Sequence, residues 1–170
     1  MNEHYFLKSN RIGFRTWSFD DMDIAIELWS APETTKYVGG PLSSSQVQRR
    51  LLTERAILRL HNIQYWPMFL LETNELIGYC GLRPYKPADK IYEIGILIKS
   101  AFWGKGFGEE AAQTVIDYAF TVLRASSLFA VHNIANTHSK PLLLKLGFHY
   151  SHEEYSVSTG QHDPSYTLIR

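Results

Sequence analysis

Residues 93–112 read EIGILIKSAFWGKGFGEEAA, and this stretch decides the fold. Residues 91–99 are rich in β-branched side chains and predict a strand. Closely spaced glycines then predict a tight turn: Gly104, Gly106 and Gly108. From 108 to 123 the apolar residues recur at i, i+3 and i+4, which is typical of a helix with one buried face. The stretch therefore predicts a strand, a glycine-rich turn and an amphipathic helix in direct succession.

The glycine-rich turn has the properties of an anion site. Glycine permits positive φ angles and lets a ligand approach the backbone closely. The first turn of the following helix presents unpaired N–H groups and a partial positive charge, which favour a phosphate or pyrophosphate. The G-x-G-x-G spacing differs from the G-x-G-x-x-G of dinucleotide-binding folds and from the Walker pattern G-x-x-x-x-G-K-[ST]. The turn thus predicts a phosphate-bearing ligand of another class, with tight backbone packing as the alternative.

The chain before this stretch predicts a mixture of helices and strands. Alternation over residues 11–18 predicts a strand that buries one face, with Ile12, Phe14 and Thr16 on one side and Gly13, Arg15 and Trp17 on the other. Ser18 and Asp21 form a capping-box pattern that begins a helix over residues 20–31, which Pro32 ends. A polar cluster at residues 43–45 begins a second helix.

Two β-rich runs, residues 65–72 and 76–82, are separated by Thr73-Asn74-Glu75 and predict a hairpin. The chain after residue 123 predicts four more elements: a strand over residues 128–132, a short helix over 137–146, and strands over 149–157 and 166–170. The order β-α-α-β-β-β-α-β-α-β-β indicates an α+β fold, with a central sheet and helices packed on its faces.

Composition limits the class of protein. The 170 residues carry 17 Lys+Arg and 17 Asp+Glu, so a net charge of zero offers no broad basic face to nucleic acid. The longest apolar runs are far shorter than the ~20 residues that span a bilayer, and the first residues lack a signal-peptide apolar stretch. Cys80 is the only cysteine, which excludes an internal disulfide. We expect one domain over residues 1–170, located in the cytoplasm, with neither nucleic acid nor a membrane as partner.

Two motifs resemble those of a known family. The stretch WGKGFGEEA, residues 103–111, looks like the acetyl-CoA pyrophosphate motif R/Q-x-x-G-x-G/A of the GNAT N-acetyltransferases, in the form with Trp at the first position. Residues 136–148 are similar to the N-x-x-S-x-x-x-x-x-K-x-G-F of the RimJ/RimL-like branch, which acetylates ribosomal-protein N-termini. Weaker matches to that branch fall at residues 11–17, 36–41, 77–82 and 166–170. The resemblance implies the GNAT acyl-CoA N-acyltransferase fold, a mixed and mostly antiparallel sheet with helices on both faces.

The same resemblance implies acetyl-CoA as co-substrate and no metal. In the family, the pantetheine arm lies in a wedge where two neighbouring strands splay apart, and it hydrogen-bonds the strand backbone. The residues expected to flank the pantetheine are Ile96, Leu97 and Ile98, and Gly95 suits a bulge that exposes the backbone. The residues expected to wrap the pyrophosphate, mainly through backbone N–H groups, are Trp103, Gly104, Lys105, Gly106, Phe107, Gly108 and Glu109.

The resemblance further implies direct acetyl transfer to a primary amine in a ternary complex. The Tyr that many members use as the acid for the thiolate is replaced here by Leu143. Ser139 of the branch motif inherits a catalytic role as a hydrogen-bond donor to the sulfur, and Asn136 is expected to bind the cofactor arm. A helix cap before Pro141 is the alternative role for Ser139. Glu93 is the candidate base or water relay, and its alternative is a solvent-exposed carboxylate.

Other candidates for proton transfer are a water chain and Tyr79, Tyr85 or Tyr92. An acetyl-cysteine intermediate on Cys80 is not expected, because no histidine is placed by sequence to activate it and buried thiols are inert. The seven histidines are scattered and predict no metal site.

The acceptor is left open by the sequence. We expect its pocket between the first helices and the sheet, and the aromatic residues available to line it are Trp29, Tyr37, Tyr65, Trp66, Tyr79 and Tyr85. By resemblance the acceptor is the α-amine of a protein, or a small molecule such as a polyamine, an amino acid or an aminoglycoside. The replacement at Leu143 also leaves a non-catalytic acyl-CoA-binding protein as an alternative. Homodimers occur in such families, but no stretch of this sequence identifies an interface.

Overall fold

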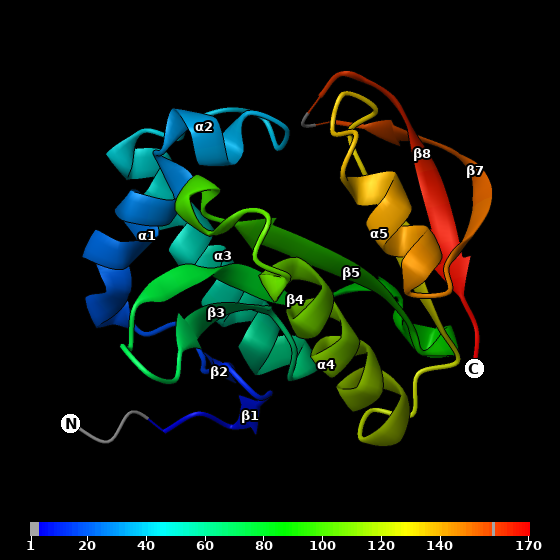
Figure 1. Ribbon diagram of the computed structural model, residues 1–170, viewed down its shortest axis with the longest axis horizontal. Helices are drawn as coiled ribbons and strands as arrows, with labels where there is room; N and C mark the ends of the chain where they lie inside the picture. Colours follow the sequence, from blue (N-terminus) through cyan, green and yellow to red (C-terminus); the bar gives the residue numbers. More distant parts are fainter. Residues whose placement is uncertain (1–3, 158) are drawn as a thin grey trace.

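A computed structural model describes residues 4–157 and 159–170 (Figure 1). Eight strands form one sheet in the order β1-β2-β3-β4-β5-β6-β8-β7. Their bounds are β1 Leu7–Lys8, β2 Ile12–Phe14, β3 Tyr65–Leu70, β4 Leu76–Lys86, β5 Ile91–Ile98, β6 Ser127–Val131, β7 His149–Ser156 and β8 Gln161–Leu168. Neighbouring strands are antiparallel except β5 and β6, which are parallel. The mixed, mostly antiparallel sheet of an α+β fold is therefore confirmed.

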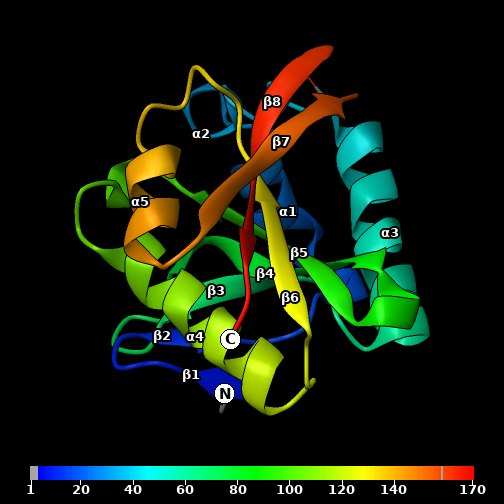
Figure 2. The ribbon, with the colours of Figure 1, turned by 90° about the vertical axis from the view of Figure 1, so that its right-hand side faces the viewer.

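Helices cover both faces of this sheet (Figure 2). Their bounds are α1 Met22–Trp29, α2 Pro32–Thr35, α3 Ser44–His61, α4 Phe107–Thr121 and α5 Ser139–Lys145, with 3₁₀ turns at Phe19–Asp21, Pro87–Asp89 and Ser100–Phe102. One apolar core lies between the sheet and α4, where Val115, Ile116 and Ala119 are fully buried. The other lies on the opposite face and includes Leu28 of α1 and Val47 of α3. Within the described ranges, no helix combines the length and apolar character needed to cross a membrane.

The predictions that depend on residues close together in the sequence are confirmed. Ser18 and Asp21 form the expected capping box, and Ser43 forms a second one with Gln46 at the start of α3. The hairpin of β3 and β4, the strand β5 and the helix α4 also lie where the sequence predicts them.

The strand expected over residues 11–18 is wrong in length. Only Ile12–Phe14 pairs with β3, and a short strand β1 that the sequence did not predict precedes it. Thr16 is exposed and Trp17 is buried, which reverses the expected alternation. The reason is that the chain leaves the sheet after Phe14, and the Trp17 indole then donates a hydrogen bond to the Tyr65 carbonyl over 2.8 Å.

Other boundaries also differ from the expectation, and β4 extends to Lys86 instead of ending at residue 82. The helix expected over residues 20–31 begins as a 3₁₀ turn and ends at Trp29, and Pro32 begins α2 as well as following α1. The helix α5 is shorter than the expected range of 137–146. The last strand begins at Gln161 rather than at 166, because β8 pairs with β7 along nearly its whole length.

The sheet opens into a wedge between β5 and β6. The two strands pair only from Ile91 to Glu93, opposite Ser127 to Phe129. Beyond Glu93 the strand β5 continues to Ile98 in register with β4, while its other edge has no partner strand among the described residues. In Figure 1 the helices α1 to α3 and the α5–β8 unit lie on either side of β5. The wedge therefore exposes the backbone of residues 94–98.

The bulge expected at Gly95 is wrong. Gly95 lies opposite Gly81 in an uninterrupted part of the β4–β5 register. A Cβ atom at position 95 would instead overlap the phenol ring of Tyr65, which crosses the strand at this point. Glycine is needed here for the close approach of a side chain, and the free edge of β5 comes from the divergence of β6.

Candidate active site

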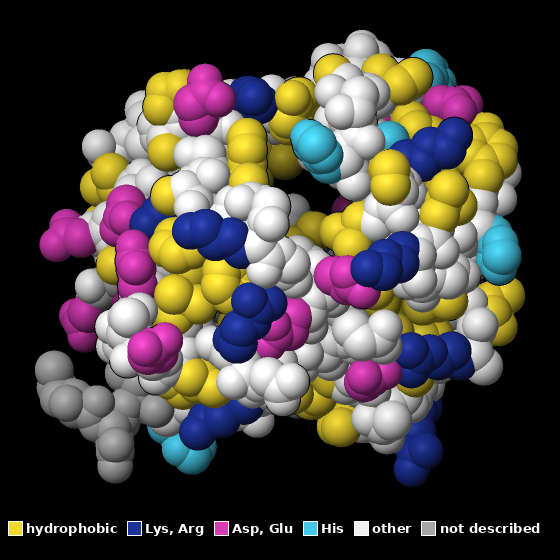
Figure 3. Space-filling model, in the orientation of Figure 1, with side chains coloured by type: hydrophobic (Ala, Val, Ile, Leu, Met, Phe, Trp, Pro, Cys, Tyr) yellow, Lys and Arg dark blue, Asp and Glu magenta, His cyan; other side chains and the backbone are white. Residues whose placement is uncertain are grey.

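Two adjoining cavities occupy the wedge. The first, of about 400 Å³, lies between the end of β5, the glycine-rich turn and the start of α5. The second, of about 280 Å³, extends from the wedge towards α3 and the β7–β8 hairpin. The residues that line both are Tyr37, Val38, Ile96, Asn136, Ser139 and Leu142. Figure 3 shows the molecule hollowed between its α2 side and its α5 side. A ligand in the first cavity would thus meet a ligand in the second beside Ser139.

The glycine-rich turn adopts the backbone that its sequence predicts. Gly104 and Gly106 have φ angles of +73° and +79°, and Gly106 is the N-cap of α4. The first backbone hydrogen bond into this helix runs from Glu110 N–H to the Gly106 carbonyl over 3.2 Å. The preceding N–H groups of the helix are therefore available to an anion, in line with the general properties of helix N-termini.

The first cavity brings together most of the expected cofactor residues. Its lining includes, from that set, Ile96, Leu97, Ile98, Trp103, Gly104, Gly106, Phe107, Gly108 and Asn136. The Trp103 indole donates a hydrogen bond to the Ile98 carbonyl over 2.8 Å and so ties the turn to the end of β5. Lys105 and Glu109 are not part of this lining. The Lys105 ammonium lies 5.2 Å from the centre of the Phe102 ring, and Glu109 forms an ion pair with Lys145 over 2.6 Å.

A clasp between Arg11 and Glu110 supports the turn from the outside, and the sequence did not reveal it. One Glu110 oxygen accepts hydrogen bonds from the Ser9 hydroxyl over 2.6 Å and from the Arg11 backbone N–H over 2.8 Å. The other oxygen accepts from Arg11 Nε over 2.7 Å. The same guanidinium lies 4.3 Å from the Phe107 ring centre and donates to the Lys105 carbonyl over 3.2 Å. No spacing rule links residues 99 positions apart.

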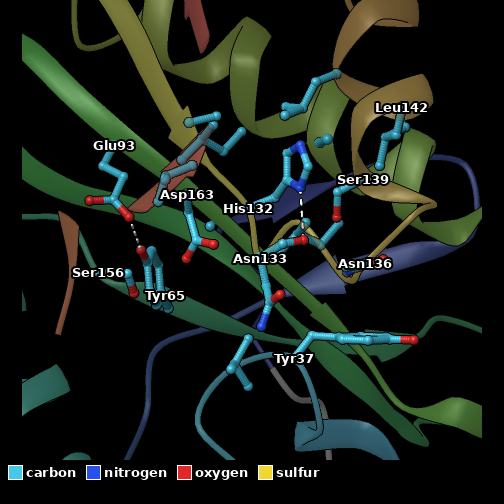
Figure 4. Close-up of a pocket in the computed structure, with 18 of the residues that line it drawn as sticks. Tyr37, Tyr65, Glu93, His132, Asn133, Asn136, Ser139, Leu142, Ser156 and Asp163 are labelled. Carbon is cyan, nitrogen blue, oxygen red and sulfur yellow. Dashed lines mark hydrogen bonds between the residues drawn. The ribbon is translucent and has the colours of Figure 1, made fainter. Parts of the chain in front are cut away.

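Ser139 is the first residue of α5, and its hydroxyl is directed into the cavity (Figure 4). The helix cap proposed as its alternative role is wrong, because His138 is the N-cap and no side chain caps this end. The Ser139 hydroxyl forms no hydrogen bond to another residue within the described chain. Asn136 is close by, and its Oδ1 accepts a hydrogen bond from the His138 backbone N–H over 3.3 Å. Leu143 lines the second cavity with a side chain that cannot donate a proton.

Glu93 lies where β5 and β6 separate, and it lines the second cavity. Its Oε1 accepts a hydrogen bond from the Tyr65 hydroxyl over 3.3 Å (Figure 4). Burial raises the pKa of Glu93, although the hydrogen bond from Tyr65 and the charge of Arg83 act in the opposite direction. The alternative of a solvent-exposed carboxylate is therefore wrong.

Only some of the expected aromatic residues reach the second cavity. Tyr37, Tyr65 and Tyr79 line it, and the last two stack with their ring centres 5.0 Å apart. Trp29 and Trp66 are instead buried in the two cores. The Tyr85 ring stacks on Phe129 with 4.2 Å between ring centres, and Tyr92 packs against the α4 core. Neither Tyr85 nor Tyr92 belongs to the cavity lining.

Sequence reasoning missed several polar residues of the second cavity, and three of them have ionisable side chains: Arg50, His132 and Asp163. They lie in α3, just after β6 and in β8, and no motif in the sequence connects them. His132 Nδ1 lies 2.9 Å from the Asn133 carbonyl oxygen, and its Nε2 is buried without a hydrogen-bond partner in the described chain.

Cys80 lies in the core, and its thiol is fully buried. Burial raises the pKa of this thiol, so the thiolate that a nucleophile requires is disfavoured. Among the residues that the structure describes, no three His, Cys, Asp or Glu side chains are grouped as ligands for a metal ion.

The sequence as a whole matches a known domain. The family model described as "Acetyltransferase (GNAT) domain" matches residues 11–149. The chain belongs to the GNAT acetyltransferase family. It is 33% identical to the uncharacterized N-acetyltransferase p20 of Bacillus licheniformis over 144 residues, which cover 84% of this chain and 81% of p20. It is 30% identical to the uncharacterized N-acetyltransferase YoaA of Bacillus subtilis (strain 168), with the same coverage of both chains.

Solved GNAT structures share this fold. A GNAT-family acetyltransferase from Bacillus anthracis superimposes with a TM-score of 0.82 at 21% identity, over 96% of this chain and 97% of that one. RimL, a ribosomal L7/L12 α-N-protein acetyltransferase, has a TM-score of 0.84 at 15% identity, over 98% of this chain and 94% of RimL. As a GNAT member, the protein is an acetyl-CoA-dependent acetyltransferase. The positive-φ glycine turn, the start of α4 and the cavity beside them fit this co-substrate.

Proposed function

We propose that residues 1–170 act as one domain that transfers an acetyl group directly from acetyl-CoA to a primary amine in a ternary complex. The observation that carries this proposal is the junction of the two cavities at Ser139 and Asn136. A thioester in the first cavity and an amine in the second would meet there without an intermediate carrier on the protein. The buried thiol of Cys80 supports the same conclusion, because it offers no alternative nucleophile.

Binding of acetyl-CoA is assigned to the first cavity. The backbone edge of Ile96, Leu97 and Ile98 that has no partner strand would hydrogen-bond the pantetheine arm, as an added strand does. The Ile98 carbonyl already accepts the Trp103 indole and is not counted among these groups. The backbone N–H groups of the turn from Trp103 to Glu109 would hold the pyrophosphate, with the dipole of α4 favouring its charge. Lys105 and Glu109 contribute backbone groups in this proposal, since their side chains have other partners.

Glu93 and Ser139 have different roles: Glu93 accepts a proton from the amine, and Ser139 stabilises the leaving sulfur. Glu93 accepts a proton from the acceptor ammonium, directly or through a water, and the neutral nitrogen forms its bond to the acetyl carbon. The C–S bond breaks, and the hydroxyl of Ser139 donates a hydrogen bond to the sulfur as negative charge develops on it. The nitrogen loses a second proton after it has bonded to the acetyl carbon. A serine hydroxyl is a weak acid, so this second proton reaches the thiolate through solvent, and Glu93 releases the first proton to solvent.

We propose that the acceptor is an α-amine, as in the RimJ/RimL-like branch, and that the reaction takes place in the cytoplasm. The N-x-x-S motif supports this assignment, since both of its polar residues line both cavities. The test is a thiol-release assay with acetyl-CoA and a panel of peptides, amino acids and polyamines. Release with peptides or amino acids supports an α-amine acceptor, and release with polyamines alone would overturn it. Absence of release with every amine would overturn the proposed transfer reaction itself.

A further inference from the structure

Arg50 of α3 gives the acceptor cavity a fixed positive charge. Its side chain is 32% exposed and lines the cavity, although the same helix buries Val47 and Leu51 in the core. Its Nε donates a hydrogen bond over 2.9 Å to Oε1 of Glu54, which is fully buried. The guanidinium lies 5.4 Å from the ring centre of Trp29. These contacts hold Arg50 in place and leave part of the guanidinium accessible from the cavity.

The other carboxylates around this cavity each accept several hydrogen bonds or ion pairs, with one exception. Glu54 lies behind Arg50, forms ion pairs with both Arg50 and Arg83, and accepts the Tyr65 backbone N–H over 3.0 Å. Asp163 is 2% exposed. It accepts hydrogen bonds from Thr159 Oγ1 over 2.9 Å, from Gln161 Nε2 over 3.1 Å and from the Ile134 backbone N–H over 3.4 Å.

Glu93 is the exception, because among the described residues its carboxylate accepts one side-chain hydrogen bond, over 3.3 Å from the Tyr65 hydroxyl, and Arg83 acts on its charge without forming an ion pair with it. Within the described lining, the cavity therefore offers a ligand one carboxylate with a single hydrogen-bond partner, Glu93, and one guanidinium, Arg50. Both lie against Tyr65. Glu93 is at its hydroxyl, and the Arg50 guanidinium is 5.8 Å from its ring centre. Tyr65 therefore contacts both charged groups.

We propose that the acceptor carries a carboxylate beside its reactive amine, and that Arg50 binds this carboxylate while the amine lies at Glu93. The inference rests on the proposed amine acetylation and specifies its substrate class. A guanidinium binds a carboxylate with charge-assisted and often bidentate hydrogen bonds. A polyamine would instead bring a second positive charge towards Arg50, which is unfavourable. The required carboxylate is supplied either by a free amino acid or by an acidic first residue of a peptide.

The first experiment compares matched acceptors with the unmodified protein. Free amino acids are paired with their α-amides, and peptides that begin with Asp or Glu are paired with peptides that begin with Asn or Gln. In one of these two arms we expect kcat/KM to be about 10-fold or more higher for the carboxylate member, through a lower KM. The arm that shows this preference identifies the source of the carboxylate. Equal rates within every pair would overturn the inference and leave the proposed function intact.

The second experiment tests Arg50 itself. In Arg50→Gln we expect the preference for the carboxylate member to disappear, so that both members of a pair react at about the same rate. In Arg50→Lys we expect part of the preference to remain, because lysine keeps the positive charge but lacks the planar guanidinium. Arg49→Gln is the matched control, since Arg49 is the exposed neighbour on the same helix and should keep the full preference. An unchanged preference in Arg50→Gln would overturn the inference. Thermal stabilisation by acetyl-CoA shows whether each variant is folded. If Arg50→Gln is not folded, the preference measured in Arg50→Lys tests the inference, and an unchanged preference there would overturn it.

A binding measurement separates the inference from the proposed function. If no amine supports turnover, the proposed function is wrong, and calorimetry with the complex of protein and coenzyme A then decides the inference. Tighter binding of the free amino acid or acidic peptide than of its amide supports a carboxylate site at Arg50. Equal binding of the two members overturns it.

Discussion

The hydroxyl of Tyr65 donates a hydrogen bond to Oε1 of Glu93 across 3.3 Å. The two residues belong to β3 and β5, which are separated in the sheet by the whole of β4. The ring of Tyr65 reaches Glu93 by passing over Gly95, where any Cβ atom would overlap it. Residues from three positions in the chain thus create the environment of the proposed base.

This contact predicts the pH dependence of the reaction. Glu93 must be ionised to accept a proton, and burial raises its pKa. Activity should therefore fall with decreasing pH in a range above that of an ordinary glutamate. Tyr65→Phe removes a hydrogen bond that stabilises the charged form, so this decline should move to higher pH. Glu93→Gln should remove the decline together with most of the turnover. Unchanged turnover in Glu93→Gln, measured as a kcat–pH profile, would remove Glu93 from the mechanism.

Ser139→Ala should lower kcat while leaving the KM for acetyl-CoA within about twofold. A hydrogen bond to a charged group contributes about 1.5–3 kcal/mol, which corresponds to roughly 10- to 100-fold in rate. Ser139→Thr keeps the hydroxyl and serves as the matched control, with a smaller loss. If alanine and serine supported the same kcat in steady-state assays, the sulfur would have another donor.

Gly106→Trp should abolish the thermal stabilisation that acetyl-CoA confers. The substitution places a large side chain at the N-cap of α4, where the pyrophosphate is proposed to bind. Gly160→Trp is the matched control, since Gly160 has a similar φ of +69° with open space around its Cβ position and lies outside the first cavity. Both variants should lose about 1–2 kcal/mol through backbone strain. A preserved acetyl-CoA shift in Gly106→Trp would place the pyrophosphate elsewhere.

Glu110→Ala should weaken both folding and acetyl-CoA binding. The variant removes three hydrogen bonds that join α4 to residues 9–11, at a cost of about 2 kcal/mol. Asp117→Asn is the control, because Asp117 lies in the same helix and forms a surface ion pair with Arg170. Removing that pair should lower the free energy of unfolding by less than about 1 kcal/mol. Equal losses of stability in the two variants, measured by denaturant unfolding, would contradict the clasp.

The clasp also predicts a pH-dependent stability. Burial alone would raise the pKa of Glu110, but its hydrogen bonds with Ser9 and Arg11 outweigh burial and lower it. A carboxyl with a lowered folded-state pKa stabilises the protein at pH values above its unfolded-state pKa. This stabilisation is lost as the pH falls through the folded-state value. The difference in Tm between the parent and Glu110→Ala should therefore shrink in acid.

Cys80→Ala should keep turnover within about twofold, because the mechanism does not use the thiol. Initial rates measured at several concentrations of both substrates should give intersecting lines in double-reciprocal plots, as expected for a ternary complex. Parallel lines, or a stable acetyl group on Cys80 seen by mass spectrometry, would contradict direct transfer.

The local elements of the fold were predictable because their signals lie within a few residues of one another. The capping box at Ser18 depends on a partner three positions later, and it formed as the sequence indicates. The polar cluster at residues 43–45 begins α3, as predicted. The turn at Gly104 and Gly106 depends on the φ angles that glycine permits. Errors arose where pairing partners are distant, as at β8, whose extent depends on β7.

The sequence by itself determined the strand, glycine turn and helix, and its two motifs indicated the family and hence acetyl-CoA. The tertiary structure decided which side chains surround the acceptor. Arg50 and Glu93 come from a helix and a strand that no local pattern connects, and they share one cavity only because β5 and β6 diverge after Glu93. Backbone preferences act between near neighbours, whereas the charge of a cavity depends on which distant groups folding brings together and which of them it neutralises.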